Sequence, residues 1–106
     1  MNTVWENVDK FEKLIAEYAG SKYAVAVDSC TNALFLSMKY CKLGNDSIEF
    51  VEIPKRTYIS VPMQAIHAGY KVKFVDKDWN GAYIIGNIPV VDSAQRFTKQ
   101  MFIPNT

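Results

Sequence analysis

The sequence predicts an α/β fold, a small and mostly parallel sheet of three to five strands flanked by helices. Short runs rich in valine and isoleucine alternate with segments of helical periodicity from Tyr23 onward. This alternation is typical of parallel strands joined by right-handed crossovers. Polar turns follow several of the expected strands, at the edge of the sheet where α/β proteins bind ligands. With 106 residues, the chain predicts a single domain, residues 1–106.

Composition excludes several classes of function. Twelve Lys and Arg against 11 Asp and Glu give a net charge of +1, so nucleic-acid binding has no electrostatic support. No apolar run approaches the length that crosses a membrane, and the charged N-terminal segment is unlike a signal peptide. Cys30 and Cys41 match no metal-ligand spacing and fit a reducing compartment better than a disulfide framework. We therefore expect a cytoplasmic protein.

The first segment predicts an amphipathic helix that packs against another part of the protein. Thr3 and Glu6 have the spacing of a capping box. Gly20 supplies the left-handed residue that ends many helices. The apolar positions recur at helical spacing and are Val4, Val8, Phe11, Leu14 or Ile15, and Tyr18.

The remaining elements are expected to alternate along the chain. They are a strand over Tyr23–Val27, a helix from Thr31 to about Cys41 ended by Gly44 and Asn45, a strand over Ile48–Ile53 closed by Pro54, a helix from Ser60 with Pro62 in its first turn and Gly69 after it, and strands over Lys71–Val75 and Ile88–Val91. The Val-rich first strand is typical of burial on both faces, and apolar positions nearly ring the second helix. Lys71 and Lys73 suit a sheet edge. Residues 76–87 are expected to form a loop.

The junction between the first strand and the second helix is a candidate anion site. The first N–H groups of a helix have no internal partner, and the helix dipole favours negative charge there. One interpretation places a phosphate above Ser29, Cys30 and Thr31. The other is that Asp28 or Ser29 only caps the helix, as such residues commonly do.

Four motifs in register resemble the pyridoxal-phosphate-dependent sugar aminotransferases of the DegT/StrS type. The resemblance extends from Phe11 to about Phe97 and covers most of the chain. The motifs are Phe-Glu-x-x-x-Ala-Glu-Tyr-x-Gly followed by Tyr-Ala-Val-Ala-Val, Ser29-Cys30-Thr31-Asn32-Ala33-Leu34, Pro54-x-x-Thr57-Tyr58, and Asp92-Ser93-Ala94-Gln95. The resemblance implies a fragment of the large domain of a fold type I aminotransferase, shortened between Asp76 and Val90.

The resemblance also implies a cofactor site for pyridoxal 5'-phosphate. Its residues would be Ser29, Cys30, Thr31, Tyr58, Asp92 and Gln95. Backbone N–H groups of Cys30 and Thr31 would hold the phosphate, and Tyr58 would stack on the pyridine ring. Asp92 would pair with the ring nitrogen and make the ring a better electron sink, with Gln95 near the phenolic oxygen. From the residues alone, Tyr58 is an ordinary buried tyrosine and Asp92 a cap with Gln95 as its capping-box partner.

The expected activity is limited by what the chain lacks. In the resembled family the Schiff-base lysine follows the Asp-x-x-Gln motif at some distance, and Lys99 is too close behind Gln95 to be that residue. The family's small C-terminal domain is absent too. We therefore expect the cofactor-binding half of a nucleotide-sugar aminotransferase, which moves an amino group from an amino acid to a keto-sugar, inactive as this chain alone. The alternatives are a non-catalytic binding or oligomerisation module and a vestigial fragment.

The resemblance has a consequence for partners. In the family's sheet, later strands separate the first strand from the second. Without them, Tyr23–Val27 would keep unpaired backbone groups unless the sheet closes or another chain supplies the pairing. We therefore expect a homo-oligomer, a dimer, that forms through the sheet edge or the first helix. A second chain that supplies the missing half is the other expectation.

Overall fold

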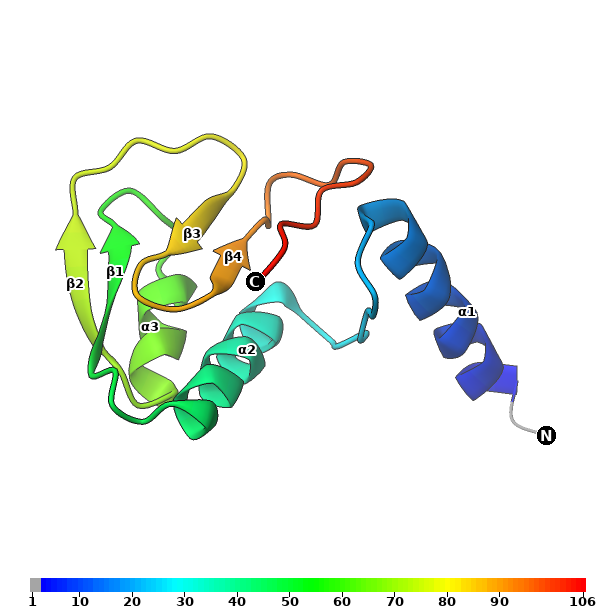
Figure 1. Ribbon diagram of the computed structural model, residues 1–106, viewed down its shortest axis with the longest axis horizontal. Helices are drawn as coiled ribbons and strands as arrows, with labels where there is room; N and C mark the ends of the chain where they lie inside the picture. The colour runs from blue at the N-terminus through cyan, green and yellow to red at the C-terminus, as the bar shows by residue number, and fades with distance from the viewer. Residues whose placement is uncertain (1–2) are drawn as a thin grey trace.

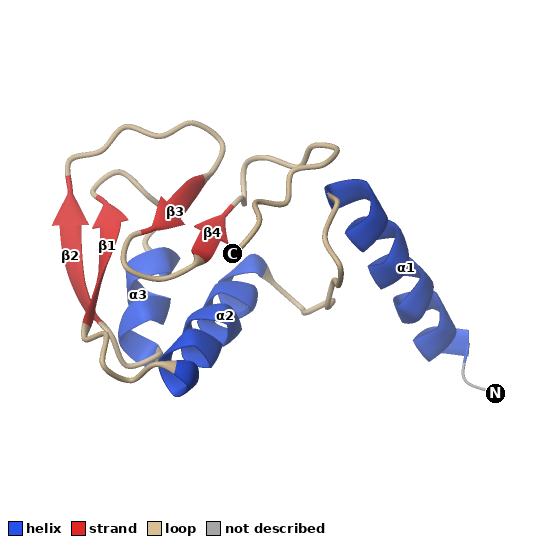
Figure 2. Cartoon of the chain, in the orientation of Figure 1, coloured by secondary structure: helices blue, strands red, loops and turns tan. Residues whose placement is uncertain are grey.

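The computed structural model describes residues 3–106, with side chains from Val4 onward, so the predicted cap at Thr3 lies outside the described side chains. Figures 1 and 2 show an α/β body with one helix standing apart from it. The elements are α1 (Thr3–Ala19), α2 (Cys30–Gly44), β1 (Phe50–Pro54), α3 (Ser60–His67), β2 (Lys71–Val75), β3 (Tyr83–Ile85) and β4 (Val90–Asp92). Within this part of the chain, no helix is long and apolar enough to cross a membrane.

The strands form two short ladders joined by a single bridge. β1 pairs in parallel with β2 from Phe50–Lys71 to Pro54–Val75, and β3 pairs antiparallel with β4. An antiparallel bridge between Glu52 and Gly86 connects the two ladders. β4 therefore runs in the same direction as β1, and both strands end at the same edge of the sheet. The prediction of a mostly parallel sheet holds only for β1 and β2, and β3 lies where a loop was predicted.

The core lies between the strands and the helices α2 and α3. Met38, Val51, Ile53, Ala65 and Ile85 have no exposed surface. Pro62 lies in the first turn of α3, where its missing N–H costs nothing, and Gly69 (φ +105°) turns the chain into β2. The predicted elements at β1, α3 and β2 are therefore confirmed.

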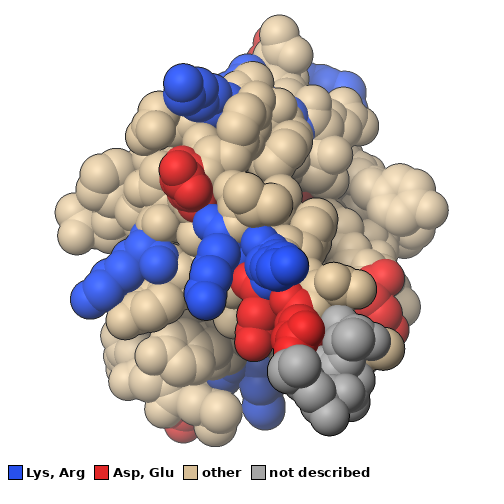
Figure 3. All heavy atoms as spheres, turned by 90° about the vertical axis from the view of Figure 1, so that its right-hand side faces the viewer, with Lys and Arg blue, Asp and Glu red and all other residues tan. Residues whose placement is uncertain are grey.

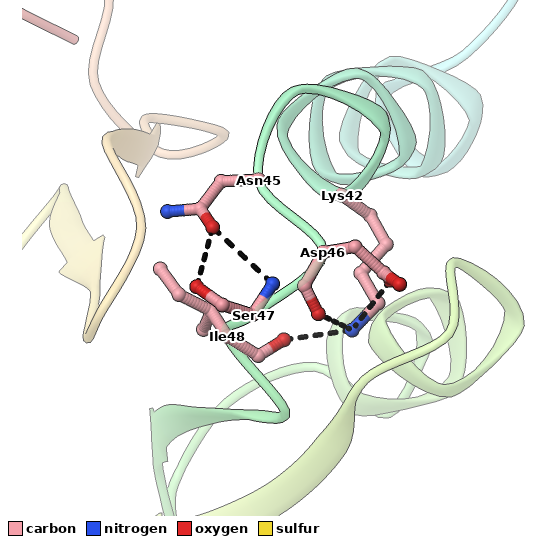
Figure 4. A network of polar contacts seen from close by, with 5 residues as sticks. All are labelled: Lys42, Asn45, Asp46, Ser47 and Ile48. Carbon is pink, nitrogen blue, oxygen red and sulfur yellow. Dashed lines mark hydrogen bonds and ion pairs between the residues drawn. The ribbon is translucent and has the colours of Figure 1, made fainter.

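Polar contacts fix the end of α2 to the start of β1 (Figure 4). Lys42 Nζ donates to the carbonyl oxygen of Ile48 at 2.7 Å and lies 3.5 Å from Asp46 Oδ1. Asn45 Oδ1 accepts from both the backbone N and the hydroxyl of Ser47, at 3.2 and 2.5 Å. This turn fixes the direction of α2 relative to β1, and with it the position of the N-terminus of α2.

The predicted deep burial of α2 is wrong. Only Leu34 and Met38 are buried, while Leu36, Tyr40 and Leu43 are 52, 80 and 77% exposed. Residues spaced by three or four positions share one face of a helix, so the exposed residues form a stripe opposite the core. Leu36 and Tyr40 line an apolar groove together with Ile15 of α1 and Phe102 of the tail.

The predicted strand over Tyr23–Val27 is also wrong. The segment is irregular, and Tyr23 and Val25 are 73 and 79% exposed. Valine-rich sequence favours a strand only where a neighbour supplies hydrogen-bond partners, and no ladder within residues 3–106 includes this segment. Instead, the backbone N–H of Ala26 donates to Glu12 Oε2 at 2.7 Å.

Helix α1 forms as predicted but does not pack against the body as expected. Gly20 (φ +78°) ends it, with Ser21 N donating to Ala16 O at 3.0 Å in a Schellman arrangement. From Val4 to Ala19 only Ala16 is buried, whereas Phe11 and Leu14 are 56 and 65% exposed. The end-on view in Figure 3 shows acidic and basic side chains interspersed with uncharged surface on this side.

The C-terminal tail holds the end of α1. Backbone N–H groups of Gln100 and Phe102 donate to the carbonyl oxygens of Tyr18 and Ala19, each at 2.8 Å. The rings of Tyr18 and Phe97 lie 4.9 Å apart. These contacts satisfy carbonyl groups that the end of a helix leaves unpaired, and they fix the direction in which α1 projects.

Candidate cofactor-binding site

The ends of β1 and β4 meet at a cavity of about 380 Å³. Tyr58 reaches it from the turn after β1, whereas Asp92 and Gln95 reach it from the end of β4 and the following turn. The cavity is lined by Arg56, Thr57, Tyr58, Trp79, Gly81, Asp92, Ala94 and Gln95. The structure thus brings together three of the six residues that the sequence singled out.

Asp92 is the buried acid of this cavity. It is 6% exposed, and its Oδ1 accepts a hydrogen bond from Ala94 N at 3.1 Å. Arg96 N donates to Ser93 O at 3.0 Å and closes a tight turn, so the segment is not the first turn of a helix. The helix cap with Gln95 as capping-box partner is therefore not what forms, and Asp92 caps a tight turn instead. Its carboxylate also lines the cavity.

Tyr83 lies opposite Asp92 in the β3–β4 ladder. Its hydroxyl lies 2.5 Å from Thr57 Oγ1, which joins β3 to the turn after β1. Burial raises the pKa of Tyr83 well above its ordinary value, against the opposing effect of the Thr57 hydrogen bond, and the nearby Asp92 carboxylate raises it further. Tyr83 therefore stays protonated and can donate a hydrogen bond at this edge.

Trp79 and Arg56 form one wall of the cavity, and neither was singled out in the sequence analysis. The indole Nε1 of Trp79 donates to the carbonyl oxygen of Arg56 at 2.6 Å, and its ring lies 4.8 Å from that of Tyr83. Arg56 forms exposed ion pairs with Asp76 and Asp78 at 3.2 and 2.7 Å. The available signal was a tryptophan in an otherwise polar loop, because a large aromatic side chain there needs a packing partner.

The N-terminus of α2 lies close enough to Asp92 for that carboxylate to act on Cys30, although no residue of α2 lines the cavity. Ser29 Oγ accepts from Asn32 N at 3.1 Å, and Asp28 Oδ1 accepts from Asn32 Nδ2 at 2.6 Å. The cap expected at Asp28 or Ser29 is therefore Ser29. The N–H groups of Cys30 and Thr31 donate to no acceptor within residues 3–106.

Cys30 links the helix end electrostatically to the buried acid. Loss of water around its thiol raises the pKa of Cys30, and the Asp92 carboxylate raises it further. The thiol is exposed and stays protonated at neutral pH. Free N–H groups, an aromatic face and a buried carboxylate thus lie along one edge of the sheet.

Comparison with known proteins identifies the family. The sequence matches the DegT/DnrJ/EryC1/StrS aminotransferase family over residues 1–88. The chain belongs to this family. The match includes the N-terminus of α2 and the turn with Tyr58, and it ends before Asp92 and Gln95.

Curated DegT/DnrJ/EryC1/StrS relatives are several times longer than this chain. It is 42% identical over 73 residues to the spore coat polysaccharide biosynthesis protein SpsC of Bacillus subtilis (69% of this chain, 18% of SpsC). It is 31% identical over 83 residues to GDP-perosamine synthase of Caulobacter vibrioides (74% of this chain, 22% of that protein). The chain therefore spans about a fifth of these relatives. No solved structure matches it significantly.

Members of the DegT/DnrJ/EryC1/StrS aminotransferase family depend on pyridoxal phosphate, and the groups at this edge are chemically suited to that cofactor. A buried carboxylate suits a protonated ring nitrogen, and free N–H groups at a helix N-terminus suit a phosphate. Asp92 and the start of α2 supply these groups. Tyr58, 75% exposed, offers an aromatic face that a flat ring can cover.

Proposed function

We propose that this chain is the cofactor-binding part of a sugar aminotransferase and that it binds pyridoxal 5'-phosphate at the edge where β1 and β4 end. The observation that carries the proposal is the buried Asp92 carboxylate in a cavity with Tyr58 and Gln95, next to the free N–H groups at the start of α2. A buried carboxylate is costly unless it is paired, and a protonated ring nitrogen is a suitable partner.

In the proposed complex each group has one role. The N–H groups of Cys30 and Thr31, next to the Ser29 cap, hold the phosphate, and the helix dipole adds to their attraction. Tyr58 covers one face of the ring. Asp92 keeps the ring nitrogen protonated, and when bound the cofactor supplies an electron sink for amino transfer.

The positions of the lysines in this chain favour cofactor binding without complete amino transfer. Transamination of this kind needs a lysine beside the cofactor. The residues that line the cavity around Asp92 include no lysine, and Lys77 lines an adjoining hollow that does not include Asp92. We therefore propose that the lysine comes from sequence outside this chain, from a continuation or a second polypeptide. The alternative, a non-catalytic binding module, requires the same cavity.

The relatives suggest the substrate class. The names of the two relatives refer to polysaccharide biosynthesis and to a GDP-linked amino sugar. By analogy, the complete protein would act on a nucleotide-linked keto-sugar with an amino acid as amino donor. The free thiols of Cys30 and Cys41 support a cytoplasmic location.

Cofactor binding can be measured through Trp79, which lines the cavity. The other tryptophan, Trp5, lies in α1, so a Trp5→Phe background isolates the signal. We expect saturable quenching on titration with pyridoxal phosphate and at least about tenfold weaker binding for Asp92→Asn, because the paired charge is removed. Asp46→Asn is the matched control, since Asp46 is an exposed carboxylate at the far end of α2.

Two further readouts test the phosphate contact at the start of α2 and the absence of a lysine bound to the cofactor. Pyridoxal without the phosphate should bind more weakly than pyridoxal phosphate if the start of α2 holds an anion. Borohydride treatment of the complex followed by peptide mapping should find no single modified lysine. Absence of saturable quenching, or equal binding by the Asp92→Asn protein, would refute the proposed site.

A further inference from the structure

Two hydroxyl groups join the turn after β1 to the strand that ends in Asp92. Tyr83 and Asp92 are opposite one another in the antiparallel β3–β4 ladder, so their side chains lie on the same face of the sheet. The Tyr83 hydroxyl lies 2.5 Å from Thr57 Oγ1. Thr57 comes directly before Tyr58 in the turn after β1. The three polar side chains therefore connect the two parts of the chain that supply the cavity with Tyr58 and Asp92.

Tyr83 is close to the cavity without being part of its lining. Its side chain is buried, and the residues around the cavity include Thr57 and Asp92 but not Tyr83. The Tyr83 ring packs against Trp79 with 4.8 Å between the ring centroids, which fixes the direction of its hydroxyl. A buried hydroxyl beside a buried carboxylate is costly unless both are hydrogen-bonded. Any effect of Tyr83 on a ligand in the cavity must therefore act through a neighbouring side chain.

The chemistry of these groups fixes the direction of the hydrogen bonds. An ionised carboxylate can only accept, so a hydrogen bond between Tyr83 and Asp92 uses the Tyr83 proton, and the Tyr83 oxygen is left to accept from Thr57. The electrostatics agree with this order. Burial has the largest effect and raises the pKa of Tyr83, the Thr57 hydrogen bond lowers it, and Asp92 raises it through both its charge and a side-chain hydrogen bond. A donor to the phenolate lowers a tyrosine pKa, whereas an acceptor of the phenol proton raises it.

We propose that Tyr83 is a positioning residue for Asp92, and that its hydroxyl, oriented by Thr57, donates to the Asp92 carboxylate and holds it toward the cavity. The N–H of Ala94 binds Asp92 Oδ1 from the turn that follows β4. Hydrogen bonds from two different segments prevent the carboxylate from rotating. The inference rests on the proposed function, in which Asp92 is ionised and pairs with a ring nitrogen. It adds that Thr57 and Tyr83 set the position of that carboxylate relative to Tyr58.

The first test measures the affinity for pyridoxal phosphate in the Trp5→Phe background. Tyr83→Phe removes the hydroxyl and keeps the ring against Trp79, and we expect about fivefold to tenfold weaker binding. In Asp92→Asn protein the same change should alter the affinity by less than about twofold, because Tyr83 acts through the carboxylate. Tyr70→Phe is the matched control. Tyr70 is 3% exposed, and its hydroxyl has no hydrogen-bond partner among the residues that the structure describes, so its loss should leave the affinity unchanged.

Thr57 offers a second pair of variants. Thr57→Val keeps the shape of the side chain and removes the hydroxyl, and we expect about threefold weaker binding or more. Thr57→Ser keeps the hydroxyl and should bind within about twofold of the unsubstituted residue. Equal effects of the two substitutions would overturn the proposal, because the hydrogen bond would then have no part in the loss. Circular dichroism checks that each variant remains folded.

The ionisation of Tyr83 provides a readout that needs no cofactor. It can be followed by NMR of protein labelled with ¹³C at the tyrosine Cζ, with the Tyr83 signal assigned through Tyr83→Phe. Asp92→Asn should lower the pKa of Tyr83, and adding Thr57→Val should raise it again, because a donor to the phenolate is lost. Cys30, the other titratable group that acts on Tyr83, is unchanged throughout.

The two readouts separate failure of this inference from failure of the cofactor site. The expected changes in the pKa of Tyr83 without saturable binding of pyridoxal phosphate would support the hydrogen bonds from Thr57 to Asp92 and refute the cofactor site alone. Saturable binding that Tyr83→Phe leaves unchanged would overturn the positioning role. So would a pKa of Tyr83 that Asp92→Asn does not lower.

Discussion

Truncation of Met38 tests whether α2 is fixed to the sheet as the structure shows. Met38 has no exposed surface and lies in the core cluster with Leu34 and Ile53. Replacing a fully buried methionine by alanine removes its transfer free energy and leaves a cavity, which costs about 2–5 kcal/mol. Leu43→Ala on the same helix changes a side chain that is 77% exposed, and we expect a change within about 0.5 kcal/mol.

Urea denaturation followed by far-ultraviolet circular dichroism measures both variants. With a denaturant slope of about 1.5 kcal/mol per M, a loss of about 3 kcal/mol lowers the midpoint of Met38→Ala by about 2 M. Equal effects for the two variants, or a cost below about 1 kcal/mol for Met38→Ala, would refute the packing of α2 described above.

Three further predictions concern the edge of the sheet and the chain turns. The pKa of Tyr83 is raised above its ordinary 10.0, so the unfolded chain loses this proton at lower pH than the folded protein. The free energy of unfolding, measured by denaturation at each pH, should therefore hold below about pH 10 and fall above it. The fall should be less steep in Tyr83→Phe. Gly20→Ala should speed amide exchange in α1, because φ is +78° at this position. Gly44→Ala at the end of α2, where a Cβ would meet nothing within 4 Å, should not speed amide exchange in α2. Gly86→Ala should lower the melting temperature, since its Cβ would lie 2.7 Å from Glu52 Cβ.

The sequence predicted those parts of the fold that local chemistry determines. Gly20 and Gly69 ended helices as expected because a positive φ is cheap only for glycine. The strands β1 and β2, and the place of the β2 lysines at a sheet edge, also followed from pattern alone. The structure of Tyr23–Val27 was not predicted correctly, because strand propensity describes the preference of a segment and does not report whether another strand lies beside it to pair with.

The candidate site was predicted in part, for a topological reason. The rule that ligands lie at the carboxyl edge of a parallel sheet placed Tyr58 near Asp92, and the antiparallel β3 preserves this because it returns β4 to the direction of β1. The contributions of Trp79 and Tyr83 were missed, since both depend on a loop whose path no periodic pattern encodes. The roles of these residues toward a cofactor stay predictions.

The most direct test of the central claim is a titration of the ¹⁵N-labelled protein with pyridoxal phosphate, followed through individual amide signals. We predict saturable shifts at the amides of Cys30 and Thr31, which contact the phosphate, and at Ala94, whose N–H is bonded to Asp92. Pyridoxal should shift Ala94 but leave Cys30 and Thr31 nearly unchanged. Shifts confined to other surfaces, or none at these three amides, would contradict the account.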